Sequence, residues 1–195
     1  MRKIPWFIQL ILVFVIAFVG ARLVMTQVLS KDTVLGISME PTLKDNDRLI
    51  SIRHKHVARN DIVVIDAPDR TDNTLYIKRV IGMPGDSVFV KDGRLYINGK
   101  VQAQPYLKTK FMRNEIKTWG EETGEDTTGV HFTGDFNIAT DRATQRSRVP
   151  AGEYFVMGDN RFYSHDGRAF GFVKAASVKS VVVLRYWPFS KVQIY

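Results

Sequence analysis

Two segments of this 195-residue chain carry side chains that can do chemistry together: residues 36–43, which contain Ser38, and residues 76–86, which contain Lys78. A serine hydroxyl is a weak nucleophile until a base takes its proton, and a lysine is a base only when it is neutral. The pKa of a lysine must therefore fall from about 10.4 towards 8, which burial among apolar groups can achieve. Lys78 ends the apolar run 75–77, and this run can supply the burial.

A third segment, residues 158–171, follows an apolar run and begins with a turn signal, Gly158-Asp159-Asn160. Ser164 and Asp166 within it can hydrogen-bond a neighbouring lysine or the backbone. Each segment also has an ordinary structural interpretation. A single serine most often caps a turn, a single lysine is most often solvated, and the third segment taken alone is most often a tight polar loop.

Other reactive groups have weaker support in the sequence. Cysteine is absent, which excludes a thiol nucleophile and thiolate zinc sites. His165 lies between Ser164 and Asp166, but adjacent loop residues point apart and a catalytic triad needs them to converge. His54 and His56 alternate along an expected strand and could bind a metal, although no third ligand is indicated. We therefore expect neither a metal nor a cofactor.

The three segments, in their order along the chain, resemble the successive conserved boxes of the type I signal peptidases, which are Ser/Lys serine proteases. The match runs from the N-terminal apolar segment to about Phe172 and is weakest across residues 102–150. The resemblance implies a membrane-bound endopeptidase that removes signal peptides after small residues. It implies Ser38 as nucleophile, Lys78 as general base, Ser164 as the residue that orients Lys78, an Asp166–Arg168 supporting pair, and substrate-pocket walls at Val34, Leu43, Tyr76 and Ile77.

Two positions depart from the family pattern. Gly36 stands where some members have a serine that assists the oxyanion hole, and Gly167 stands where the third box often has a serine. Two alternative functions stay open: a self-cleaving repressor, which would need a DNA-binding head in place of the apolar segment, and an anchored β domain that only binds a partner.

The elements that must position these residues begin with a membrane anchor at residues 1–29. An apolar run from Ile4 to Ala21, interrupted by Gln9, approaches the roughly 20 residues that cross a bilayer, and Met1-Arg2-Lys3 precedes it. The alternative is a cleaved secretory signal. Both place the remaining chain outside the cytoplasm, and the anchor makes the protein single-pass in the cell membrane. We expect Met39, Phe162 and Tyr163 to lie at the lipid surface.

Residues 30–195 are expected to form a mainly β domain, an antiparallel sheet of the signal-peptidase kind. Short β-rich runs at 48–53, 61–66, 74–78, 87–91, 94–97, 153–157 and 177–186 are bounded by turn residues. Asp92-Gly93 and Asn98-Gly99 predict two successive hairpins. The polar, turn-rich stretch 102–150 predicts a small inserted lobe, and no sustained helical periodicity is seen outside the anchor.

The net charge of +8 favours an anionic partner surface. The basic residues are scattered and form no nucleic-acid motif, so a lipid bilayer is the expected partner, together with preprotein signal peptides. The oligomeric state is left open.

Overall fold

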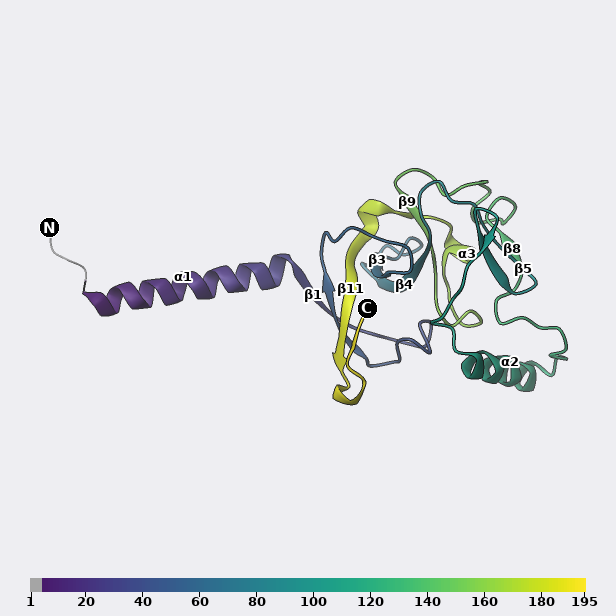
Figure 1. Ribbon diagram of the computed structural model, residues 1–195, viewed down its shortest axis with the longest axis horizontal. Coiled ribbons are helices and arrows are strands. Elements are labelled where there is room, and N and C mark those ends of the chain that lie inside the picture. The colour runs from purple at the N-terminus through teal and green to yellow at the C-terminus, as the bar shows by residue number, and fades with distance from the viewer. Residues whose placement is uncertain (1–4) are drawn as a thin grey trace.

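The computed structural model describes residues 5–195 and divides them between one long helix and a β domain (Figure 1). Helix α1, Trp6–Gln27, projects away from the domain. It is long and apolar enough to cross a membrane, although a signal sequence would meet the same criterion. Residues 1–4, including the predicted basic start, lie outside the described part of the chain.

The main sheet has eight strands, ordered β1-β2-β11-β3-β4-β9-β10, with β12 paired to β11. All of its neighbouring strands are antiparallel, as expected. The strands are β1 Leu29–Thr33, β2 Arg48–Ile52, β3 Ile62–Asp66, β4 Leu75–Gly82, β9 Glu153–Met157, β10 Val173–Lys174, β11 Val178–Trp187 and β12 Gln193–Ile194. The predicted strands are therefore present, but β4 continues past Lys78, which lies inside the strand and not at its end.

A second sheet of four strands, ordered β7-β6-β5-β8, lies at the end of the domain far from α1 (Figure 1). Its strands are β5 Val88–Lys91, β6 Arg94–Ile97, β7 Lys100–Val101 and β8 Phe136–Asn137. The two predicted hairpins join β5 to β6 and β6 to β7. Asp92-Gly93 and Asn98-Gly99 all have positive φ, between 50° and 75°, which a two-residue type I′ turn requires.

The stretch 102–150 contains a helix that was not expected, α2, Thr109–Thr123. Met112, Ile116 and Trp119 recur at helical spacing, but the polar, turn-rich surroundings obscured this signal. Phe111 and Trp119 pack on Phe132 and Phe162. The segment also supplies β8 to a sheet that begins at Val88. We therefore propose that the inserted lobe starts at β5, upstream of residue 102.

The core divides into three clusters. One fills the space between the small sheet and β9, around Val88, Ile138 and Phe155. The other two contain alternate residues of β3, with Ile62 and Val64 in one and Val63 and Ile65 in the other. Strand β3 is thus buried on both faces, and its neighbour β4 lies deep in the domain. The remaining short elements are the one-turn helix α3, Gly167–Phe170, and the 3-10 turns η1, Ala175–Ser177, and η2, Phe189–Lys191.

Candidate active site

Ser38 and Lys78 meet although 40 residues separate them: Lys78 Nζ lies 2.9 Å from Ser38 Oγ. Ser38 lies in the loop between β1 and β2, whereas Lys78 projects from the central strand β4. The loop is pinned beside the third segment, because the Asn160 amide donates to the Ser38 carbonyl at 3.0 Å. A neutral lysine at this distance can accept the serine hydroxyl proton.

Burial prepares Lys78 for that role. Its side chain is only 4% exposed, and this loss of hydration lowers the pKa of Lys78 to about 8. The charge of Arg168 also lowers the pKa, while Asp166 and Asp159 oppose the shift. With a pKa of about 8, roughly one Lys78 in ten is neutral at pH 7, against about one in three thousand for an exposed lysine.

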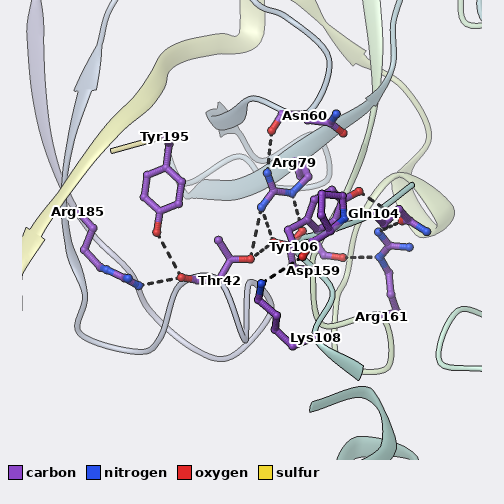
Figure 2. Close-up of polar contacts among 12 residues, drawn as sticks. Thr42, Asn60, Arg79, Gln104, Tyr106, Lys108, Asp159, Arg161, Arg185 and Tyr195 are labelled. Carbon is purple, nitrogen blue, oxygen red and sulfur yellow. Dashed lines mark hydrogen bonds and ion pairs between the residues drawn. The ribbon is translucent and has the colours of Figure 1, made fainter. Parts of the chain in front are cut away.

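A polar network centred on Arg79 and Asp159 ties the three segments together (Figure 2). Arg79, next to Lys78, forms a two-pronged ion pair with Asp159, with Nε to Oδ1 at 2.8 Å and Nη2 to Oδ2 at 2.6 Å. Thr42 Oγ1, from the Ser38 loop, donates to the same carboxylate. Asp159 is 0% exposed, so its charge is stabilised by these partners rather than by water.

Further contacts extend this network. The Arg79 guanidinium lies 3.9 Å from the centre of the Tyr106 ring, and its Nη1 donates to the Asn60 carbonyl. Arg185 and Tyr195 both donate to the Thr42 carbonyl. Thr42, Arg79 and Asp159 were not predicted as site residues. The signal was available, since each stands within one of the three recognised segments.

Asp166 and Arg168 form the expected pair. Arg168 Nε and Nη2 donate to the two carboxylate oxygens at 2.9 and 2.8 Å, and the Gly158 amide adds a third hydrogen bond to Asp166. Burial alone would raise the pKa of Asp166, but the hydrogen bonds and charge of Arg168 outweigh it and hold that pKa below its usual range. Asp166 therefore stays ionised and secures the loop that carries Ser164.

Ser164 reaches the site without the expected hydrogen bond to Lys78. Its Oγ is buried and makes no hydrogen bond of good geometry among residues 5–195, although it lies near enough to Asp166 to help lower the pKa of that carboxyl. The loop is packed tightly here: a Cβ on Gly158 would lie 2.1 Å from Ser164 Oγ and 2.5 Å from the Ser38 carbonyl oxygen. Glycine at position 158 is therefore required by the close approach of the Ser38 backbone, in the first segment, to the third segment.

A cavity of about 510 Å³ opens beside the pair, and both Ser38 and Lys78 line it. Val34, Tyr76 and Ile77 contribute to its wall as expected. Leu43 does not. It is 0% exposed and belongs to the core cluster that also contains Val34. Leu43 therefore supports the pocket wall from behind.

The two departures from the family pattern have different explanations. Gly36 has a φ of 80°, and its amide donates to Asp45 Oδ1 at 2.7 Å. A serine there would be strained, because this left-handed region disfavours a side chain. Gly167 is buried, and a Cβ would lie 2.8 Å from the Val156 carbonyl oxygen. The local backbone thus selects glycine at both positions.

The alternative chemistries do not fit the geometry. His165 pairs with Asp69 on the protein surface, and Asp166 is held by Arg168, so these residues form no triad with Ser164. His54 lies in the turn after β2 with a φ of 57°, so the expected strand alternation with His56 is wrong. Within residues 5–195, no three His, Asp or Glu side chains gather as metal ligands.

The expectation that Met39, Phe162 and Tyr163 lie at the lipid surface is only partly consistent with their exposure. Met39 is 1% exposed and belongs to the same core cluster as Leu43, so it cannot contact lipid. Phe162 is half-buried and stacks on Trp119, while Tyr163 is exposed. Leu35, near Ser38, is instead 82% exposed. The apolar surface beside the nucleophile is therefore formed by a different residue of the same loop.

Comparisons with known proteins agree on one family. Residues 7–187 match the family described as signal peptidase, peptidase S26. Signal peptidase IB of Staphylococcus aureus strain Mu50 is 36% identical over 96% of this chain and 91% of its own length. Signal peptidase I V of Bacillus subtilis strain 168 is 38% identical, over 93% and 98%.

Solved structures lead to the same result. The crystal structure of a signal peptidase I from Enterococcus faecalis V583 superposes with a TM-score of 0.53 at 38% identity, covering 65% of this chain and 97% of that one. The Ser38–Lys78 pair thus lies in a fold shared with a solved signal peptidase, and the sequence match extends over most of the chain. This protein belongs to the signal peptidase family, peptidase S26.

Proposed function

We propose that this serine endopeptidase removes signal peptides from exported preproteins, with Ser38 as nucleophile and neutral Lys78 as general base. The observation that carries the proposal is the 2.9 Å contact between Ser38 Oγ and a lysine whose pKa burial lowers to about 8. A buried lysine next to a serine costs stability, and such perturbed groups concentrate at functional sites.

The geometry supports a two-step acyl transfer. Lys78 Nζ accepts the hydroxyl proton as Ser38 Oγ attacks the carbonyl carbon of the scissile bond, giving a tetrahedral oxyanion. The protonated Lys78 then delivers that proton to the departing amine, and an ester on Ser38 remains. Water, deprotonated by Lys78, attacks the ester, and the second collapse returns the proton to Ser38.

We assign positioning roles to three further residues. Ser164, whose buried Oγ makes no hydrogen bond of good geometry in the described chain, orients Lys78. Asp166 and Arg168 hold the loop that carries it. Val34, Tyr76 and Ile77 line the cavity beside Ser38, and their bulk favours small substrate residues next to the cut.

We also propose that α1 anchors the protein and that the β domain lies outside the cytoplasm, at the lipid surface. At about 1.5 Å per residue, the 22 residues of α1 extend roughly 33 Å, which matches the hydrocarbon thickness of about 30 Å. Val28 alone separates α1 from β1, so the catalytic domain begins directly at the membrane boundary. Signal peptides emerge at the same depth.

The function can be tested on a radiolabelled preprotein inserted in liposomes with the full-length protein. We expect one new N-terminus, identified by mass spectrometry, immediately after a small residue. Ser38→Ala should leave the preprotein intact, because no nucleophile remains. Cleavage that persists in the Ser38→Ala protein, or that EDTA abolishes and zinc restores, would refute the proposal.

A further inference from the structure

A second cavity, of about 440 Å³, lies on the main sheet where the turn after β2 meets β11. It shares no lining residue with the cavity beside Ser38. For comparison, one water occupies about 30 Å³ in the liquid, so a phosphate group fits with room to spare. The polar residues that line it are mostly basic: Arg53, His54, Lys55, His56 and Lys179, with Ser180 at the sheet.

Two donors in this cavity lack partners. Arg53 Nε and Ser180 Oγ are both inaccessible to solvent and have no hydrogen-bond partner within the described chain. Ser180 is 2% exposed as a whole residue. A buried donor left unsatisfied is costly, and most such groups in folded proteins are paired. Both residues line the cavity, so a shift of their side chains would expose these atoms to an acceptor that enters it.

The charges around the cavity leave an excess of positive groups. Asp61 pairs with Lys55 at 3.2 Å, and Asp66 pairs with Lys179 at 2.7 Å. Across residues 5–195, no ion pair is formed by Arg53. An anionic oxygen ligand therefore fits the cavity electrostatically, and arginine is well suited to phosphate.

The cavity also lies close to the end of α1. The Arg53 amide donates to the Val28 carbonyl at 2.8 Å, one residue beyond the last residue of α1. Ile52 is the register partner of Leu29, the first residue of β1. Figure 1 shows β1 at the junction of helix and domain. If α1 spans the bilayer, this turn lies at the depth of the lipid headgroups.

We propose that the cavity binds the phosphate of an anionic phospholipid headgroup and so fixes the catalytic domain on the membrane surface. The proposal rests on the membrane anchoring stated under the proposed function. Arg53 and Ser180 donate to the phosphate oxygens, and the surrounding basic side chains disfavour a headgroup with its own cation, such as choline. The position beside α1 favours a lipid over free phosphate, which has the same chemistry.

The test titrates the full-length protein with phosphatidylglycerol or phosphatidylcholine in detergent and counts bound lipids by native mass spectrometry. We expect one phosphatidylglycerol to bind preferentially. Arg53→Gln should raise its dissociation constant about tenfold or more, since one charge-assisted hydrogen bond is lost. The matched control, Arg94→Gln, removes the same charge from an exposed site on β6 and should have no effect. Ser180→Ala should weaken binding less, and it reports on the cavity if the Arg53 variant fails to fold.

Equal binding by the wild type, Arg53→Gln and Ser180→Ala proteins would overturn the proposal, as would equal affinity for the two lipids. Displacement of phosphatidylglycerol by millimolar inorganic phosphate would show that free anions, not lipids, are the ligand. Cleavage of a short signal-peptide substrate in the same detergent should be unchanged by Arg53→Gln, because no cavity residue touches Ser38 or Lys78. A wild-type protein that shows no preference for phosphatidylglycerol but retains Ser38-dependent cleavage would therefore refute this site alone. A wild-type protein that binds phosphatidylglycerol preferentially but cleaves no signal peptide would refute the proposed function alone.

Discussion

Replacing Lys78 by alanine should lower kcat/KM for a signal-peptide substrate by at least about 10⁴-fold, the range found when a nucleophile–base unit is broken. Lys78 is the side chain that contacts Ser38 Oγ, and its burial makes it a usable base at neutral pH. Lys78→Arg should lose as much activity, because a guanidinium stays protonated at any working pH. The measurement is steady-state cleavage of one peptide by the purified variants.

Folding must be checked in the same samples, because Lys78 lies in the central strand β4. Circular dichroism and thermal melting should show a folded domain for both variants. Removing a buried charge that lacks a carboxylate partner should not destabilise the protein. A well-folded Lys78→Arg protein that cleaves at a near-normal rate would exclude Lys78 as the general base.

Deleting residues 1–25 should slow the cleavage of a bilayer-held preprotein by about 100-fold or more, while leaving the chemistry intact. Tethering enzyme and substrate in one membrane raises their effective concentration towards millimolar without any new contact. The deletion should not disturb the folding of the β domain, because the described residues of α1 are exposed and lie outside the core clusters. The comparison uses truncated and full-length proteins on one preprotein in liposomes.

A soluble signal-peptide substrate in detergent provides the control for this deletion. Both proteins should cleave that peptide at similar rates, because Ser38 and Lys78 are unchanged. Equal rates on the liposome-held preprotein as well would show that α1 only localises the enzyme. The inference that α1 keeps Ser38 at the membrane depth at which the cleavage site of the preprotein emerges would then be wrong.

The reacting pair could be predicted from sequence because residue type restricts the chemistry severely. The spacing of Ser38 and Lys78 in the sequence could not predict their contact. Only the combination of the three sequence motifs, in their order along the chain, suggested that the two residues form a pair. Strand positions were also predictable, since short β-branched runs and Asp-Gly or Asn-Gly turns encode local geometry. Local sequence patterns do not determine the distance between two side chains from distant segments, and the structure supplies that distance.

What sequence reasoning missed depends on tertiary packing. From its place on the strand, Arg79 could have reached either solvent or a carboxylate, and only the folded structure shows that it is buried against Asp159 and Thr42. Leu43 is apolar, as a residue of a pocket wall would be, but in the folded chain its side chain is buried in the core. Helix α2 could have been found, since Met112, Ile116 and Trp119 recur at helical spacing within a stretch that is otherwise polar and turn-rich.

The most direct test of the central claim is the pH dependence of kcat/KM for a soluble signal-peptide substrate, which reports the pKa of the essential base in the free enzyme. Because burial lowers the pKa of Lys78 to about 8, kcat/KM should rise about tenfold per pH unit below that value and level off above it. The sign follows from the neutral amine being the active form. A profile that is flat between pH 6 and 9, or that falls as pH rises through 8, would contradict catalysis by neutral Lys78.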